Sequence, residues 1–238
     1  MKIVIATHKP CSLPENELYL PLQVGADLSE EDFGYAKDNS GENISPLNNK
    51  FCELTALYWA WKNLNDKSIG LEQYRRRFII DIPLDESKVY VPKKRHYVIE
   101  TLYSHYAHTH TEAHLTETKN IIDEMCPEYS EAFSKALSKR SGYMFNMFIM
   151  PKELLDDYCN WLFPILFELD RRTDSSRYSA FDKRYIGRVG ELLFNVWITR
   201  NGIRSCELNY TEYGLSFFHK LKRYLKARIS GISYSESA

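Results

Sequence analysis

The residues that most clearly indicate chemistry are the adjacent Arg75, Arg76 and Arg77, which follow a short apolar stretch. Three neighbouring guanidinium groups repel one another and need anionic partners, and a bidentate contact with phosphate oxygens is the strongest such pairing. In an extended segment side chains alternate, so we expect Arg75 and Arg77 on one face and Arg76 on the other. The alternative is a set of salt bridges to carboxylates such as Asp81 or Asp85.

Glu191 is the candidate catalytic acid or base. It follows Gly187-Arg188-Val189-Gly190 and opens an apolar helix that we expect over residues 189–199. A carboxylate at a helix start is stabilised in its ionised form by the helix dipole. An ionised carboxylate that glycines leave accessible suits a general base acting on a hydroxyl. The alternative is a capping role or an ion pair with Arg188.

Four histidines, His105, His108, His110 and His114, lie within ten residues of one another. The pairs at positions 105/108 and 110/114 would share helix faces at spacings that metal ions use. However, no carboxylate or cysteine is placed to complete either set. The other interpretations are scattered surface histidines, or contacts with the hydroxyl or phosphate of a substrate.

The elements that would position these residues alternate between strands and helices. Buried strands are expected over residues 2–6, 21–26, 68–71, 88–91, 144–150 and 203–207, and helices over residues 51–63, 97–106, 115–125, 128–137, 152–169 and 189–199. This alternation predicts an α/β fold with a mainly parallel sheet. Thr7-His8-Lys9-Pro10 follows the first strand, where open α/β sheets bind ligands, although a solvated loop is the alternative.

The polar loop over residues 35–49 leads into the helix at 51–63, and Asn48 or Asn49 is the expected cap of that helix. Glu53 falls in the first turn of this helix, where the helix dipole favours an anion. We therefore assign Glu53 a structural role.

Composition excludes several classes of protein. The net charge is −1, so no global field recruits nucleic acid, and we expect no nucleic-acid partner. The five cysteines are scattered and form no CxxC pair, which fits a reducing cytoplasm. The first residues read as a strand rather than a signal peptide, and no apolar run reaches the roughly 18 residues of a transmembrane helix.

The C-terminal residues 215–238 form a separate basic tail after an expected domain over residues 1–214. Apolar residues at 218, 221, 225 and 229 line one helical face, and lysines and arginines occupy the rest. A basic amphipathic helix over residues 215–229 would lie on an anionic membrane. The alternative is a terminal helix docked on the protein.

Several segments together resemble the bacterial capsular and exopolysaccharide biosynthesis family, a former domain-of-unknown-function family that includes galactofuranosyl- and galactosyltransferases. The resemblance covers nearly the whole chain. Its segments are Lys2-Ile-Val-Ile-Ala-Thr-His-Lys9, Gln23-Val-Gly-Ala26, Asp38-Asn-Ser-Gly-Glu-Asn-Ile44, Phe51-Cys-Glu-Leu-Thr-Ala-Leu-Tyr-Trp-Ala-Trp-Lys62, Ile69-Gly-Leu-Glu-Gln-Tyr-Arg-Arg-Arg-Phe78, Asn146-Met-Phe-Ile-Met150, Tyr158-Cys-Asn-Trp-Leu-Phe163 and Gly190-Glu-Leu-Leu-Phe-Asn195.

The resemblance implies a GT-A-like nucleotide-sugar transferase with a helical insertion. Residues 71–76 stand where related enzymes carry a metal-binding Asp-x-Asp motif, but only Glu72 is acidic here. The arginines would then neutralise the diphosphate directly, so no metal cofactor is expected, with Mn²⁺ or Mg²⁺ as the alternative. Residues 145–149 are similar to a Phe-Asn-x-Gly strand that lines the sugar pocket.

The resemblance also distributes roles among the residues. The implied donor-binding residues are Thr7, His8, Lys9, Glu72, Gln73, Tyr74, Arg75, Arg76 and Asn146. Glu191 is the implied general base, and His105 and His108 are expected to contact the acceptor.

The implied reaction is an inverting transfer of galactofuranose or galactose from a UDP-sugar to a lipid-linked oligosaccharide. It would serve capsule, O-antigen or exopolysaccharide synthesis in the cytoplasm, at the inner face of the membrane. The alternative function is a non-catalytic nucleotide-sugar-binding module that scaffolds a polysaccharide assembly complex.

Overall fold

The centre of the fold is a mixed β-sheet that begins with the apolar N-terminal residues. The computed structural model describes residues 1–14 and 16–213. Its strands are β1 (Lys2–Thr7), β2 (Tyr19–Gln23), β3 (Ala36–Lys37), β4 (Ser68–Gln73), β5 (Arg76–Phe78), β6 (Val89–Pro92), β7 (Arg95–His96), β8 (Ser141–Gly142), β9 (Phe148–Pro151), β10 (Ser205–Leu208) and β11 (Tyr210–Glu212). Its α-helices are α1 (Asn48–Phe51), α2 (Leu54–Asn63), α3 (Leu102–Thr109), α4 (Ala113–Met125), α5 (Ser130–Leu137), α6 (Lys152–Arg172) and α7 (Tyr185–Asn201).

The sheet order is β10-β6-β9-β4-β1-β2-β3, with β5 and β11 forming a side branch from β4. Strands β3, β2, β1 and β4 run parallel, and β6 and β10 are parallel to each other. Strand β9 lies antiparallel to both β4 and β6, between the two groups. The expected α/β fold with a mainly parallel sheet flanked by helices is therefore confirmed.

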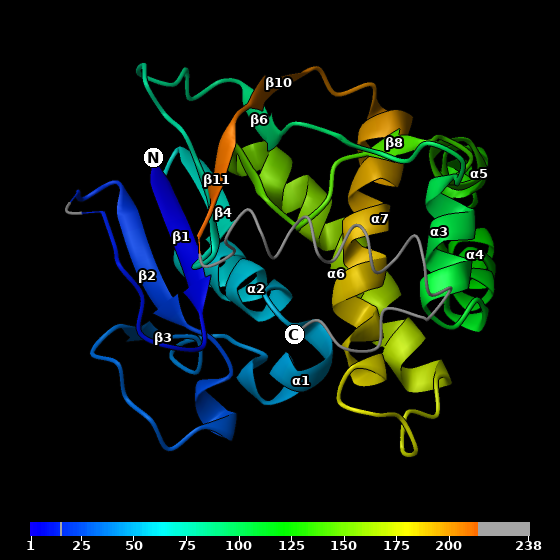
Figure 1. Ribbon diagram of the computed structural model, residues 1–238, viewed down its shortest axis with the longest axis horizontal. Helices are drawn as coiled ribbons and strands as arrows, with labels where there is room; N and C mark the ends of the chain where they lie inside the picture. The colour runs from blue at the N-terminus through cyan, green and yellow to red at the C-terminus, as the bar shows by residue number, and fades with distance from the viewer. Residues whose placement is uncertain (15, 214–238) are drawn as a thin grey trace.

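The main hydrophobic core lies between the sheet and helices α2, α6 and α7. Side chains of β1 alternate between two cores: Val4 and Ala6 face this main core, and Ile3 joins a smaller cluster with Phe78 and Ile149 on the other face. Figure 1 shows α6 and α7 between the sheet and the group of helices α3, α4 and α5.

The group α3–α5 is the expected helical insertion, and a short antiparallel ladder closes its base. Strand β7 pairs with β8, so that Arg95 lies opposite Gly142 and His96 opposite Ser141. Helix α5 packs on α7 and α4 packs on α6. The insertion therefore extends the helical layer away from the sheet.

Several element boundaries differ from the sequence-based expectations; for example, the strand expected over 144–150 begins only at Phe148. The second strand ends at Gln23 because Gly25, with φ 66°, leads the chain into a 3₁₀ turn. The helix expected over 51–63 is divided at Cys52 (φ 53°, ψ −131°), and neither Asn48 nor Asn49 caps it, since α1 already begins at Asn48. The first helix of the insertion starts at Leu102, where a capping box between Thr101 and Ser104 satisfies its first amides.

A further difference concerns α7, which begins at Tyr185 instead of 189 and ends at Asn201, with Gly202 as a left-handed C-cap. Gly187 and Gly190 lie inside this helix. A Cβ at Gly187 would be 3.1 Å from Cys52 Cβ, and one at Gly190 would be 2.8 Å from Leu54 Cδ1. The two glycines thus allow α7 to approach the junction of α1 and α2 closely.

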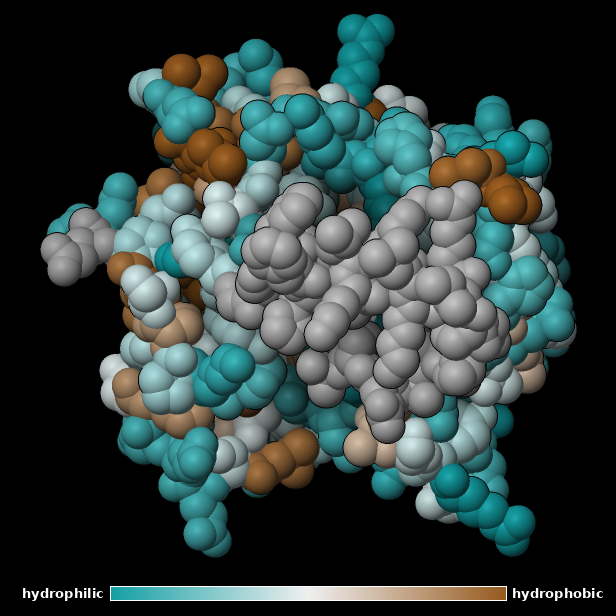
Figure 2. All heavy atoms as spheres, viewed as in Figure 1, coloured by the Kyte–Doolittle hydropathy of each residue, from teal (hydrophilic) through white to brown (hydrophobic). Residues whose placement is uncertain are grey.

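The visible face of the described residues is mainly hydrophilic, with small, separated hydrophobic patches (Figure 2). Within the described ranges, no helix has the length and apolar character needed to span a bilayer. The predicted membrane-binding segment, residues 215–229, and the expected tail, residues 215–238, lie outside the described residues.

Candidate active site

Two adjoining cavities lie at the carboxyl ends of β1 and β4. The first, here called the α7 cavity, has a volume of about 250 Å³ and reaches from the β4–β5 turn to α7 and α3. The second, the β1 cavity, has a volume of about 540 Å³ and reaches from the same turn to the end of β1. The residues that line both cavities are Cys52, Glu53, Gln73, Arg75 and Arg184. The two cavities therefore form one cleft with a shared wall.

The wall of the α7 cavity carries arginines from four separate parts of the chain. They are Arg75, Arg76, Arg95, Arg184 and Arg188. Among the described residues, only Arg76 of these five makes an ion pair with a carboxylate, at 2.8 Å from Glu212. The cavity has only two acidic lining residues, Glu53 and Glu191. This excess of cationic groups over carboxylates favours an anionic ligand.

The arginine triplet does not alternate as an extended segment would. Tyr74 and Arg75 form the turn between β4 and β5, so Arg75 and Arg76 both reach the α7 cavity. Arg76 Nη1 donates to Gln73 Oε1 at 2.9 Å. Arg77 is buried elsewhere, with its guanidinium 4.1 Å from the centre of the Tyr213 ring. The expectation that Arg75 and Arg77 share a face is therefore wrong, and Glu212, rather than Asp81 or Asp85, supplies the salt bridge.

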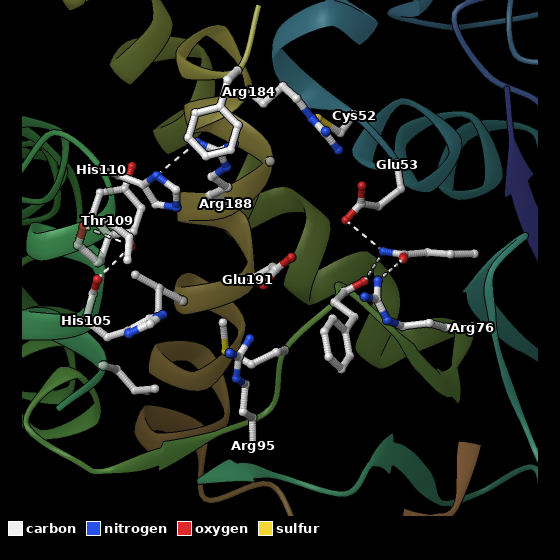
Figure 3. Close-up of a pocket in the computed structure, with 18 of the residues that line it drawn as sticks. Cys52, Glu53, Arg76, Arg95, His105, Thr109, His110, Arg184, Arg188 and Glu191 are labelled. Carbon is white, nitrogen blue, oxygen red and sulfur yellow. Dashed lines mark hydrogen bonds between the residues drawn. The ribbon is translucent and has the colours of Figure 1, made fainter. Parts of the chain in front are cut away.

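Arg188 and Arg184 project from the beginning of α7 and the turn before it (Figure 3). Arg188 Nη1 lies 3.0 Å from His110 Nδ1. The guanidinium carbon of Arg188 lies 3.8 Å from the centre of the Phe181 ring. Burial, followed by the charge of Arg188, lowers the pKa of His110 to about 3. His110 is thus neutral at physiological pH and accepts the hydrogen bond. Arg184 Nε donates to the Cys52 thiol at 3.3 Å.

Glu191 projects from α7 between the insertion side of the cavity and the β4–β5 side (Figure 3). It is the seventh residue of α7, so the expected stabilisation of its ionised form at a helix start is wrong. Burial, followed by the nearby charge of Glu53, raises its pKa to about 7. The backbone amide of Phe145 and the charges of Arg76 and Arg95 act in the opposite direction. A carboxyl group that titrates near neutral pH can take up and release a proton during a reaction.

Glu53, which the sequence assigned to a structural role, is the second acid of the cleft. Its Oε1 accepts hydrogen bonds from Gln73 Nε2 at 3.1 Å and from Asn146 Nδ2 at 2.9 Å. No described residue donates to its other oxygen. The two amides hold one edge of the carboxylate, and the other oxygen remains available to a ligand in the cleft.

The backbone around the cavity is strained at three positions. Cys52, Phe145 and Asn146, with φ of 53°, 80° and 50°, are the non-glycine residues of positive φ within the described ranges. Cys52 and Phe145 line the cleft, and Asn146 anchors Glu53. Such conformations cost about 1–3 kcal/mol each and are concentrated at functional sites.

The predicted donor-binding residues at the end of β1 divide between interior and surface. Thr7 is completely buried and its hydroxyl donates to the Lys9 carbonyl at 2.5 Å. His8 lines the β1 cavity together with Tyr74, and their ring centres are 5.0 Å apart. Lys9 is exposed, with its ammonium 4.9 Å from the centre of the Tyr74 ring. His8, Lys9 and Tyr74 therefore gather at one end of the cleft.

Glu72 and Asn146 do not line either cavity. Glu72 is fully buried on the face of β4 opposite Gln73, where its Oε1 accepts from the Phe78 amide at 2.9 Å. Burial raises the pKa of Glu72 to about 8. Asn146 donates to Glu53 and to the Gly187 carbonyl, and so serves the site indirectly.

The histidines of the insertion have different environments. His105 and His110 line the α7 cavity, whereas the His108 side chain is 69% exposed and lies outside both cavities. Glu100 accepts from both His105 and His108 at 2.6 Å. His114 is buried, between the hydroxyl groups of Tyr106 and Tyr178. The structure therefore brings His105, but not His108, to the cleft.

The residues at the end of β4 do not fit a divalent cation. Glu72 points away from the cleft, and the side chains that reach it there are Gln73, Arg75 and Arg76. No group of three or more His, Cys, Asp or Glu side chains in residues 1–14 and 16–213 is arranged to hold a metal ion. Guanidinium groups instead occupy the position, and they repel a metal cation.

The fold is similar to that of a solved glycosyltransferase structure. The chain is similar to the apo structure of WbbM, a bifunctional glycosyltransferase, with a TM-score of 0.82 and 29% sequence identity. The match covers 90% of this chain and 45% of that chain, so this protein spans less than half of WbbM. Residues 2–83 and 79–202 match the DUF4422 family, which is described as a domain of unknown function. The chain belongs to the DUF4422 family. No curated protein matches it.

Proposed function

We propose that this protein is a glycosyltransferase that moves a hexose from a UDP-sugar to a hydroxyl of a lipid-linked oligosaccharide. The observation that carries the proposal is the cleft with five arginines, four of them without a carboxylate partner among the described residues, around the carboxyl group of Glu191. The arginines would stabilise the negative charge of a nucleoside diphosphate leaving group. Glu191 would act as the base for the attacking hydroxyl. The similarity to WbbM supports the same class of reaction.

The nucleotide of the donor is proposed to occupy the β1 cavity. This cavity is the larger of the two, and Tyr74 and His8 give it flat ring surfaces against which a base can stack. Arg75 and Arg184 stand at the shared wall. A nucleotide in the β1 cavity would therefore direct its diphosphate toward these arginines and its sugar into the α7 cavity.

The sugar is proposed to contact Glu53 and to lie beside Glu191. The free oxygen of Glu53 can accept a hydrogen bond from a sugar hydroxyl. Hydrogen bonds of this kind to a buried, positioned acceptor are what distinguish one hexose from another. Galactofuranose and galactose are the donor sugars that we propose.

The proposed chemistry is a single displacement with inversion at the anomeric carbon. The Glu191 carboxylate takes the proton of the acceptor hydroxyl while the hydroxyl oxygen forms a bond to the anomeric carbon. The bond from that carbon to the UDP oxygen breaks, and its electron pair leaves with the diphosphate. Arg75, Arg76 and Arg184 would neutralise the charge that develops there, without a metal ion.

The acceptor is proposed to enter from the insertion side of the α7 cavity. That side is lined by His105, Tyr97, Tyr106 and Phe181, which combine rings and polar atoms as sugar-binding surfaces do. The exposed His108 lies outside both cavities, so we assign it no role in acceptor binding. A lipid-linked acceptor would place the protein at the inner face of the cytoplasmic membrane, in the synthesis of a surface polysaccharide.

Release of UDP from a panel of UDP-sugars, with a lipid-linked acceptor fraction, tests the proposal. UDP-galactofuranose and UDP-galactose are the first two donors to compare, and the Glu191→Gln variant is the catalytic control. We expect acceptor-dependent UDP release by the wild type and its loss in the variant. Tight UDP-sugar binding with no release by either protein would instead support a non-catalytic scaffolding module.

A further inference from the structure

Val98 and Ile99 form the most exposed apolar pair of the described residues. Their side chains are 89% and 82% exposed, in the loop between β7 and α3. Figure 2 shows a hydrophobic patch, with hydrophilic spheres next to it, on the side of the molecule where Figure 1 places α3 and α5. Two adjacent aliphatic side chains in water are unfavourable, and the burial of such a side chain is a main source of binding free energy.

Backbone hydrogen bonds anchor this loop on both sides of the pair. The Tyr97 amide donates to the Arg140 carbonyl at 2.8 Å, and the Leu102 amide donates to the Lys139 carbonyl at 2.8 Å. These two bonds fix the chain on both sides of Val98 and Ile99. The pair is therefore presented at the tip of a short, anchored loop.

A group of cations lies beside this tip, and one of them, Arg140, donates to the Val98 carbonyl at 3.5 Å. Lys94, Lys135, Lys139 and Arg140 are all exposed, and none of them forms an ion pair with a described carboxylate. Burial, followed by the charges of Lys94 and Lys135, lowers the pKa of Lys139, because the lysines lie close together. Two acids flank the two segments that meet here, residues 92–99 and 132–143: Glu131, and Glu100, whose carboxylate accepts hydrogen bonds from His105 and His108.

We propose that the Val98–Ile99 tip and the adjacent group of cations form a membrane-docking surface for an anionic lipid bilayer. The aliphatic pair enters the boundary between headgroups and acyl chains, and the four cations lie at the level of the anionic headgroups. A small apolar tip with four cations beside it matches the layered chemistry of such a bilayer.

The tip is next in sequence to residues that line the α7 cavity. Arg95 and Tyr97 precede it, Leu102 follows it, and all three line the α7 cavity. Docking through this loop would bring the acceptor side of the cleft to the bilayer surface. A glycan attached to a membrane lipid could then reach Glu191 without leaving its membrane. This last step rests on the proposed function, whereas the docking surface does not.

Co-sedimentation of the full chain with vesicles tests the proposal. The probe is vesicles of phosphatidylcholine with or without phosphatidylglycerol, and the variants are Ile99→Asp and Lys135→Glu/Lys139→Glu. Ile82→Asp is the matched control, because Ile82 is 70% exposed in a segment that contains Asp81 and Asp85. UDP affinity and the melting temperature, measured in parallel, establish that each variant is folded.

We expect binding to anionic but not to neutral vesicles, and weaker binding at high salt. Ile99→Asp should lower the partition coefficient about tenfold, since it places a charge where the bilayer needs an apolar group. The double lysine variant should lower it by a similar factor, and Ile82→Asp should leave it unchanged. Wild-type affinity in the two test variants would overturn the proposal, whichever way the transferase assay turns out. Equal losses in Ile99→Asp and Ile82→Asp would overturn it as well.

Discussion

Asn146 donates a hydrogen bond to the Glu53 carboxylate at 2.9 Å, and this contact connects the segment before β9 with the start of α2. Asn146 needs a left-handed backbone, with φ 50°, to reach this position. The same amide nitrogen also donates to the Gly187 carbonyl at 3.0 Å. One side chain thus connects α2, α7 and the segment before β9, and fixes the orientation of the acid that we propose for sugar recognition.

Removal of the Asn146 amide should impair use of the sugar and spare the nucleotide. We expect Asn146→Ala to reduce kcat/KM for the UDP-sugar about 10- to 100-fold, because Glu53 loses a charge-assisted hydrogen bond. The affinity for UDP, which lacks the sugar, should stay within about twofold of wild type. Steady-state kinetics and calorimetry on the same preparation separate the two effects. Asn146→Gly, which also lacks the amide but tolerates positive φ, distinguishes the lost hydrogen bond from backbone strain.

The pH profile should follow the deprotonation of Glu191. Because burial raises its pKa from 4.5 to about 7, the carboxyl is protonated in acid and becomes a competent base as the pH rises. We expect kcat/KM to increase through about pH 7 and then to level off. Glu191→Gln should lower the rate about 10²- to 10⁴-fold and abolish the acidic limb. Glu207→Gln, an exposed control, should reproduce the wild-type profile. An unchanged limb in Glu191→Gln would assign the titration to another group.

We expect Glu72 to affect the stability of the folded protein and not the binding of the donor. Its pKa is raised from 4.5 to about 8 in the folded protein, so folding favours the protonated form. The stability from this group is complete below about pH 4.5 and is lost as the pH rises through about 8, an effect of a few kcal/mol at most. Glu72→Gln should therefore flatten the decrease of Tm between pH 5 and 8.

The UDP affinity of Glu72→Gln should match that of the wild type, because the side chain lies outside both cavities. Weakened UDP binding in a variant of unchanged Tm would restore Glu72 to the donor site. Glu72→Ala, which leaves the Phe78 amide without its partner, is expected to be the less stable of the two variants.

The sequence predicted the sheet and the segments around the cleft, because both depend on local patterns. The apolar run after Met1 is strand β1, and the segment after Leu71 does carry arginines into the cleft. The contributions of Arg184 and Arg188 could not be predicted, since they reach the cleft through the packing of α7 against the α1–α2 junction. No local pattern marks a single arginine in a turn as a cavity residue.

The place of Glu53 in the cleft and the protonation state of Glu191 could not be predicted from the sequence, for the same physical reason. The sequence placed both carboxylates near helix starts and inferred their states from the helix dipole. In the folded chain, burial and their mutual repulsion determine the state of Glu191, and these depend on contacts between residues far apart in sequence. The orientation of Glu72, in contrast, could have been predicted from the sequence. Side chains alternate along a strand, so if Gln73 faces the cleft, the preceding Glu72 faces away from it.

We propose that arginines, in place of a metal ion, hold the donor diphosphate, and a measurement of UDP binding in EDTA distinguishes the two. Calorimetry should give equal UDP affinities for the wild type in EDTA and in Mn²⁺. In EDTA, Arg75→Ala should weaken UDP binding about 10- to 100-fold, the loss expected for a charge-assisted contact with phosphate, while the exposed Arg204→Ala control should not. UDP binding that disappears in EDTA and returns with Mn²⁺ would show that a metal ion holds the diphosphate, and binding that is unchanged in Arg75→Ala would show that Arg75 does not.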